Sequence, residues 1–218
     1  MLTCSISEAN LAFDLNSEAY SEAPRPRIAP VEKPYQPETE SALDSWMLGP
    51  RPIEPLRLFR TLAVHDTLAA SMLPMHSRIL GAQAMVPPIL REVMIHRTSA
   101  LTGSEYEWGV HVVGFGKPVG LTDAQLESTV RGAATDECWD GPQASVFRLA
   151  DEMHKTCRVS DELWSLLSSH FVDRQILELV TMAGWYHLIA YVCNAVELEP
   201  ETWAARFPLE TARPDDLA

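Results

Sequence analysis

The segment Arg91-Glu-Val-Met-Ile-His-Arg-Thr-Ser-Ala-Leu-Thr-Gly-Ser-Glu-Tyr-Glu-Trp-Gly-Val-His111 decides how this chain folds. Its apolar spacing predicts two helices separated by Thr102-Gly103, a typical helix stop. On the second helix Glu107 and His111 are four residues apart, so their side chains share one face. Glu92, on the first helix, is expected to face them. A carboxylate and an imidazole in this arrangement can share a proton and direct it at a bound molecule.

Composition and charge restrict the class of protein. The chain has 218 residues, enough for one ordinary domain with tails, and its hydrophobic fraction of 46% can supply a core. A net charge of -13 argues against nucleic acid or an anionic membrane as a partner and favours a small-molecule or protein partner. The first residues lack the features of a signal peptide, so a cytosolic location is expected. The cysteines are scattered, without Cys-x-x-Cys or metal-ligand spacing: Cys4, Cys138, Cys157 and Cys193.

Helical periodicity continues from about residue 54, and no window shows the alternation typical of a strand. Thr122-Asp-Ala-Gln125 has the form of a capping box, and Ser160 or Asp161, and then Asp173, are expected to start later helices. Helices are expected over 54–63, 67–85, 89–101, 104–116, 122–132, 140–153, 160–167 and 173–196. The fold class is therefore all-α, with about eight helices.

The most apolar stretch, from Ile176 to Cys193, contains Glu178 and His187. These polar residues favour a buried helix over a membrane span.

The first 52 residues differ from the rest because they are acidic and hold seven of the 16 prolines. Proline prevents long helices between positions 24 and 37. We expect residues 1–52 to form an arm that is either flexible or wrapped around a neighbouring subunit. Its apolar anchors in the second case are Ile28, Val31, Tyr35, Trp46, Met47 and Leu48. The helical domain is expected to span 53–205, followed by an acidic tail over 206–218.

The order of these parts resembles the carboxymuconolactone decarboxylase and AhpD-like alkylhydroperoxidase superfamily over about residues 54 to 200. The resemblance rests on Arg91-Glu-Val-Met-Ile-His-Arg97, on Leu101-Thr-Gly-Ser-Glu-Tyr-Glu-Trp108 with His111, and on Gly184-Trp-Tyr-His-Leu-Ile-Ala-Tyr-Val-Cys-Asn194 followed by Val196-Glu-Leu-Glu199. It implies an AhpD-like all-α bundle that assembles as trimers or hexamers, with sites near subunit interfaces. For this chain we expect a homo-oligomer, a dimer, trimer or hexamer.

The peroxidase branch of this superfamily uses a Cys-x-x-Cys pair, a preceding glutamate and a following histidine. Glu92 and His111 match the glutamate and the histidine, whereas the cysteine positions fall on Ser104 and Glu107. Thiol–disulfide exchange needs two sulfurs, so a cysteine-dependent peroxidase is excluded. The decarboxylase branch also lacks the cysteine pair and is similar to this chain in the pattern Glu107-Trp-Gly-Val-His111.

The candidate catalytic residues are Glu107 and His111 as the proton-transfer pair, with Glu92 orienting His111 or raising its pKa. Structural alternatives exist. Ser104-x-x-Glu107 fits a capping box, Glu92 suits the first turn of a helix, and a lone histidine is often an ordinary half-buried residue. Gly114 is expected to leave the face beside Glu107 open for a ligand.

The candidate substrate-binding residues are Tyr106, Trp108, His187, Tyr191 and Asn194. The last three form a polar stripe on a very apolar helix, which either lines a pocket or makes hydrogen bonds between helices or subunits. Trp185 and Tyr186 are expected in the core or an interface, and His96 on a solvated helix face.

We therefore predict an enzyme that needs no metal and no cofactor. Its simplest reaction is decarboxylation of a small organic acid or lactone, a lyase reaction carried out by acid–base catalysis. The alternatives are an isomerase, dehydratase or ring-opening enzyme of a biosynthetic pathway, or a non-catalytic binding or assembly protein on the same scaffold.

Overall fold

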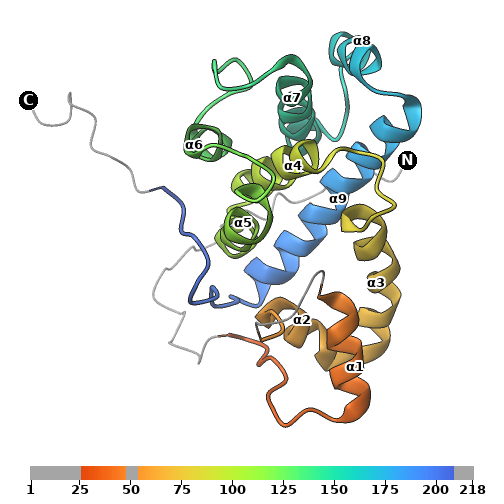
Figure 1. Cartoon of the computed structure of the whole chain (residues 1–218), viewed down its shortest axis with the longest axis vertical. Coiled ribbons are helices and arrows are strands. Elements are labelled where there is room, and N and C mark those ends of the chain that lie inside the picture. Colours follow the sequence, from red (N-terminus) through yellow and green to blue (C-terminus); the bar gives the residue numbers. More distant parts are fainter. Residues whose placement is uncertain (1–25, 48–53, 209–218) are drawn as a thin grey trace, which may run out of the picture.

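A computed structural model describes residues 26–47 and 54–208, and every regular element within them is a helix (Figure 1). The α-helices are α1 (Pro37–Trp46), α2 (Arg57–Leu62), α3 (Asp66–Leu80), α4 (Pro88–Leu101), α5 (Glu105–His111), α6 (Asp123–Arg131), α7 (Gly141–Thr156), α8 (Asp161–His170) and α9 (Asp173–Ala195). A 3-10 turn, η1 (Ala63–His65), joins α2 to α3, and a π-helix, η2 (Val112–Gly116), extends α5. The all-α prediction is confirmed. The described residues contain one α-helix more than the eight expected, because α1 forms within the predicted arm.

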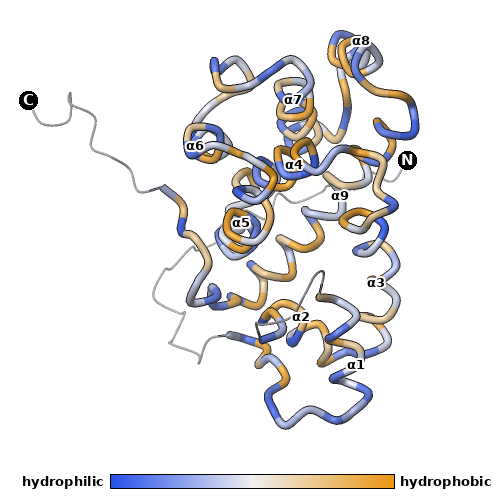
Figure 2. The backbone as a smooth tube through the Cα atoms, in the orientation of Figure 1, coloured by the Kyte–Doolittle hydropathy of each residue, from blue (hydrophilic) through white to orange (hydrophobic). Residues whose placement is uncertain are grey.

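Helices α4 and α9 form the centre of the fold. Helix α4 packs against α5, α6, α7 and α9, and α9 also contacts α5, α7 and α8. Helices α1 to α3 gather at one end of α9, and α6 to α8 lie toward the other (Figure 1). Hydrophobic segments recur along these helices between hydrophilic ones, as amphipathic helices require (Figure 2). Two buried clusters result, one around α4, α7 and α9 and one around α1, α2, α3 and the end of α9.

Several predicted helix ends are found in the structure. Thr122 and Gln125 form the capping box of α6, and the hydroxyl of Ser160 accepts a hydrogen bond from the Leu163 amide at the start of α8. Gly103 has φ +65°, the left-handed conformation that ends α4 at low cost. The Asp173 prediction is wrong by one residue, because Asp173 is the first residue of α9 and Val172 holds the N-cap position.

Part of the predicted arm packs against its own chain. The Val31 amide donates to the Arg60 carbonyl at 3.1 Å, and the Arg60 guanidinium donates to the Val31 carbonyl at 3.2 Å. Leu43 and Trp46 are buried between α1 and the helices α2 and α3. Residues 26–47 therefore make defined contacts with α2 and α3 of their own chain, and a contact of the arm with a neighbouring subunit stays a prediction. Leu48, Cys4 and the rest of 1–25 lie outside the described residues, as does 209–218 of the predicted tail.

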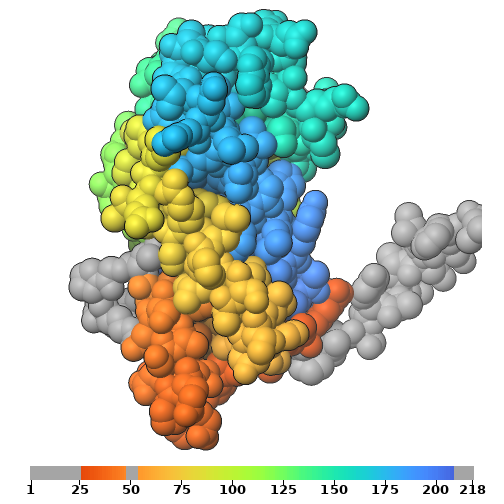
Figure 3. Space-filling model, turned by 90° about the vertical axis from the view of Figure 1, so that its right-hand side faces the viewer, coloured from red at the N-terminus to blue at the C-terminus, as the bar shows by residue number. Residues whose placement is uncertain are grey.

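Helix α9 is long and apolar enough to cross a membrane, but 56% of its most apolar window is buried inside the molecule. The buried residues are Ile176, Leu179, Met182, Ala183, Tyr186, Ile189, Ala190 and Cys193. The prediction of a buried helix is therefore confirmed. A strip of α9 nevertheless remains at the surface beside α3 (Figure 3).

Candidate active site

Helices α4 and α5 bring Glu92 and His111 together. Both side chains are buried, and His111 Nδ1 lies 2.9 Å from Glu92 Oε2. Glu92 lies in the second turn of α4, so the contact joins two consecutive helices across the bend at Gly103. An ion pair of this kind holds the imidazole ring in one orientation.

Glu107 approaches the other nitrogen of the same ring. Its Oε1 lies 3.3 Å from His111 Nε2, as expected for residues one helical turn apart. The capping-box alternative is wrong, because Ser104 occupies the N-cap position of α5 without a capping hydrogen bond from its side chain. Glu107 is therefore held by His111 and not by the start of its own helix.

Tyr186 of α9 completes the cluster. Its hydroxyl lies 3.3 Å from His111 Nε2, and its ring packs edge-on against the imidazole at 5.4 Å between centroids. The sequence predicted a core residue, and Tyr186 is indeed 1% exposed, but it also lines a cavity. A hydrophobic helix with a tyrosine on its buried face carries no sequence signal that distinguishes these two roles.

The two carboxylates control the charge of His111. Burial alone would lower its pKa, but the charges of Glu92 and Glu107 and their hydrogen bonds outweigh burial and raise the pKa to about 10. The ring is thus an imidazolium at neutral pH, the direction expected for a histidine beside Glu92. It already carries a proton on each nitrogen, so it can stabilise negative charge but cannot accept another proton.

His96 lies beside this cluster but is uncharged. It is fully buried, and its Nδ1 lies 2.7 Å from the carbonyl oxygen of Glu92. Burial, with a further contribution from the His111 charge, lowers its pKa to about 4, so it is neutral. The predicted solvated face is wrong. The His96 ring has room because residue 116 is a glycine. A Cβ at that position would lie only 2.7 Å from His96 Cε1.

The π-helix η2 begins directly after His111. Such single-turn widenings are uncommon and often occur at functional sites. Here η2 places Phe115 against His111, with ring centroids 4.8 Å apart, and brings Gly116 beside His96. The sequence predicted an uninterrupted helix over 104–116, because a π-turn leaves no clear mark on apolar periodicity.

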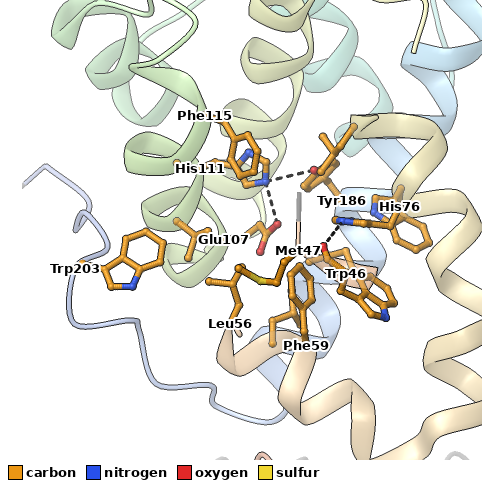
Figure 4. Close-up of a pocket in the computed structure, with 16 residues that line it drawn as sticks. Trp46, Met47, Leu56, Phe59, His76, Glu107, His111, Phe115, Tyr186 and Trp203 are labelled. Carbon is orange, nitrogen blue, oxygen red and sulfur yellow. Dashed lines mark hydrogen bonds and ion pairs between the residues drawn. The ribbon is translucent and has the colours of Figure 1, made fainter. Parts of the chain in front are cut away.

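A cavity of about 170 Å³ opens in front of Glu107, His111 and Tyr186 (Figure 4). It lies where α1 to α3 meet α5 and α9, and most of its wall is apolar. The other lining residues are Trp46, Met47, Leu56, Leu58, Phe59, His76, Leu80, Val110, Gly114, Phe115, Trp185, Ile189 and Trp203. None of the described lining residues is a lysine or an arginine. Gly114 lies on the wall as expected, whereas Glu92 is behind His111 and does not reach the cavity.

Two segments distant in sequence help to close the cavity, and the sequence did not predict either. Trp46 and Met47 come from the end of α1, and the Trp46 carbonyl lies 3.0 Å from His76 Nε2. Trp203 comes from the segment after α9, which packs against α5 where the Ala205 amide donates to the Gly109 carbonyl at 3.2 Å. A Cβ at Gly109 would collide with Ala205, so glycine is required for this contact.

The five predicted substrate-binding residues do not line the cavity. The Tyr106 hydroxyl donates to Glu201 Oε1 at 2.8 Å and accepts from the Leu58 amide, and Trp108 Nε1 donates to Thr129 Oγ1 in the core. Both have the hydrogen-bond partners that buried polar groups require. Their placement supports a structural role and not contact with a ligand.

His187, Tyr191 and Asn194 lie on a different face of α9. They border a second, more open depression together with His154 and Cys157. His187 Nε2 is 2.9 Å from His154 Nδ1, and Asn194 donates to the Thr102 carbonyl at 2.8 Å. The alternative of hydrogen bonding between helices therefore describes His187 and Asn194, and the pocket-wall alternative holds only for a depression that contains neither Glu107 nor His111.

Potential metal ligands and cysteines lie within residues 26–47 and 54–208. No group of three or more His, Cys, Asp or Glu side chains there is arranged to hold a metal ion. Cys193 is buried near Glu107, and burial, together with that carboxylate, raises its thiol pKa well above the ordinary value. A thiolate, the form that attacks peroxides, is therefore disfavoured at the cysteine that approaches the site.

Comparison with known proteins identifies the scaffold. No protein-family profile and no curated protein matches the chain. An uncharacterized peroxidase-related protein from Silicibacter sp. TM1040 superposes with a TM-score of 0.71 at 16% identity, over 87% of this chain and 100% of its own. The debrominase Bmp8 superposes with TM-scores of 0.67, for a variant in complex with 2,3,4-tribromopyrrole, and 0.66 for the apo protein. Both Bmp8 structures have 13% identity and cover 81% of this chain and 92% of their own. At these identities the similarity establishes a shared all-helical fold, consistent with the AhpD-like arrangement.

Proposed function

We propose that this protein is a cofactor-free enzyme that moves a proton to and from carbon in a small uncharged molecule, with Glu107 as the proton carrier. The observation that carries the proposal is the position of Glu107, whose carboxylate lies at the cavity wall with a buried imidazolium behind it. A debrominase and an uncharacterized peroxidase-related protein share the fold, and both names support an enzymatic role.

The roles of the cluster follow from its protonation. His111 already carries both protons, so the group left to accept a proton from a substrate is Glu107. His111 stays charged and stabilises the negative charge that develops on the substrate. Glu92 is a positioning residue, since it touches His111 and not the cavity. This assignment differs from the sequence prediction, in which His111 itself transferred the proton.

The charge of the cavity favours an uncharged substrate. Glu92 and Glu107 together outweigh the single positive charge of His111, and no described lining residue is a lysine or an arginine. A substrate carboxylate would meet net negative charge in an apolar enclosure. Isomerisation or dehydration of a neutral compound is therefore favoured over the decarboxylation predicted from the sequence.

Decarboxylation remains the second candidate because of one observation. The apolar wall would remove water from a substrate carboxylate next to the His111 imidazolium, and desolvation promotes loss of CO2. Measurement of CO2 release separates it from proton transfer alone.

The size of the cavity limits the substrate to about one ring. An engineered apolar cavity on the order of 150 Å³ holds benzene, and the cavity here is about 170 Å³. The ligand of the debrominase Bmp8, 2,3,4-tribromopyrrole, is also a single ring.

The test is hydrogen exchange at carbon in heavy water, followed by NMR with a panel of single-ring ketones, lactones and alcohols, and CO2 release from their carboxylated analogues. We expect exchange with at least one neutral compound, and Glu107→Gln to lower its rate at least about 100-fold. The matched control is Glu127→Gln, an exposed glutamate of α6, which should leave the rate unchanged. Binding of panel members without exchange or CO2 release would support a non-catalytic binding protein instead.

Self-association and a cytosolic location stay predictions. The exposed strip of α9 formed by Leu177, Leu188 and Tyr191 is the surface at which a substitution best tests self-association.

A further inference from the structure

We infer that Tyr186 is the hydrogen-bond donor that holds a substrate carbonyl oxygen, so the proposed enzyme acts on enolisable ring carbonyl compounds. This inference rests on the proposed function and narrows it to a substrate class. In this assignment Glu107 accepts the substrate's proton, and Tyr186 donates a hydrogen bond to the substrate's carbonyl oxygen.

The partners of the two ring nitrogens of His111 support this assignment. Nδ1 faces the Glu92 carboxylate and Nε2 faces the Glu107 carboxylate, at 2.9 and 3.3 Å. Ionised carboxylates only accept hydrogen bonds, so each ring nitrogen must present a hydrogen. Tyr186 Oη lies 3.3 Å from Nε2 and is therefore the acceptor in that contact.

The hydroxyl hydrogen of Tyr186 is left without a partner in the described parts of the chain. Its contact with His111 is the only hydrogen bond that Tyr186 makes to a described residue through its hydroxyl. The hydroxyl is buried and lies at the wall of the cavity. A buried donor of this kind needs an acceptor, and a carbonyl oxygen inside the cavity would supply one.

Tyr186 is suited to donate and not to ionise. Burial, with the nearby negative charges of Glu107 and Glu92, raises its pKa well above the ordinary value, so the phenol keeps its proton. The imidazolium that donates to its oxygen polarises the O–H bond and makes the hydroxyl a stronger donor.

The chemical step is balanced without any further reactant. Glu107 removes a proton from the carbon beside the carbonyl group, and the C–H electron pair forms a C=C bond. The C=O π electrons move to oxygen, where Tyr186 and, through it, His111 stabilise the enolate. The protonated Glu107 then returns its proton to the same carbon or to a conjugated carbon, and the second case is an isomerisation.

Binding can be tested separately from turnover with cyclohexanone labelled with carbon-13 at its carbonyl. Isotope-edited infrared difference spectra of the full chain should show the bound carbonyl band at lower frequency than in an apolar solvent. Tyr186→Phe should move the band back toward the apolar-solvent frequency. Tyr191→Phe, the same change on the exposed face of α9 (66% exposed), should leave it in place.

The kinetic arm uses whichever carbonyl compound exchanges hydrogen. Tyr186→Phe should lower the exchange rate at saturation about 100-fold or more, as loss of one oxyanion donor does, with a smaller change in KM. A shifted band without exchange in any compound would support this assignment while contradicting the proposed catalysis. A bound band that Tyr186→Phe does not move, or no bound ketone at all, overturns the inference.

Discussion

Tyr186 and His187 are neighbours in sequence, yet they belong to two polar clusters of opposite character on α9. Tyr186 joins a buried cluster in which two carboxylates flank His111 and raise its pKa to about 10. His187 joins a more open one, where the partner of a histidine is another histidine. Partial burial and the charge of His187 lower the pKa of His154. The sign of the neighbouring groups, more than the presence of histidine, decides which cluster can hold charge inside the protein.

The largest expected difference between the two clusters is in stability. His111→Gln leaves Glu92 and Glu107 buried without their cation, which is expected to cost about 3–5 kcal/mol of unfolding free energy. His187→Gln removes one partly exposed hydrogen-bonded pair and should cost less than about 1 kcal/mol. Urea unfolding of both variants measures the contrast. Equal losses would show that the carboxylates do not depend on His111.

The pH dependence of stability should follow the buried cluster. The folded pKa of His111, about 10, is above its unfolded value near 6.5, so the folded state binds the proton more tightly. This stabilisation is complete below about pH 6.5 and is lost as pH rises through 10, by on the order of a few kcal/mol. For His154 the folded pKa is lowered, so its small effect has the opposite sign and acts as pH falls through the acid range.

Thermal unfolding between neutral pH and pH 10.5 checks this sign. The fall in stability at alkaline pH should be much smaller in His111→Gln than in the unchanged protein, because the variant has no imidazolium to lose. Titration of tyrosine and lysine side chains contributes equally to both proteins. An identical fall in both proteins would contradict the assigned pKa of His111.

The comparison also explains what could be predicted from the sequence. Glu107 and His111 share a helix, so their proximity follows from spacing alone, and Glu92 is only one helix and a tight stop away. Such local relations are set by helical geometry. The stripe of His187, Tyr191 and Asn194 was also read correctly as one face of a helix, but periodicity does not say which cavity a face borders.

The rest of the site depends on tertiary contacts between distant segments. Trp46, Trp203 and Tyr186 reach the cavity from the region before α2, the segment after α9 and the middle of α9. No local pattern links these positions. Helix α1, inside the predicted arm, was missed for the same reason, since Pro37 is its first residue and the burial of Trp46 depends on α2 and α3. The shared helical fold was predictable because amphipathic periodicity covers the whole domain.

Two glycine-to-alanine substitutions, one beside the buried cluster and one on the exposed face of α9, should have smaller effects on stability than His111→Gln. Gly116→Ala places a Cβ 2.7 Å from His96 Cε1 and 3.0 Å from Nε2, so the buried ring must move. Overpacking of this size is expected to cost about 1–3 kcal/mol. It should also disturb the carbonyl of Glu92 that holds His96, and so lower catalytic exchange through the position of Glu92.

Gly184 lies on the exposed strip of α9. In Gly184→Ala the added Cβ would have no described atom within 4 Å. Alanine in a helix interior is favoured over glycine, so an isolated chain should gain about 0.5–1 kcal/mol. The exposed apolar residues Leu177, Leu188 and Tyr191 lie on the same side of α9 as Gly184. Whether Gly184→Ala raises or lowers the unfolding free energy therefore tests whether this side packs against a second chain in the predicted homo-oligomer. A loss of stability accompanied by a lower mass in light scattering would mean that a second chain approaches Gly184 closely, because only then does the added methyl group collide with anything.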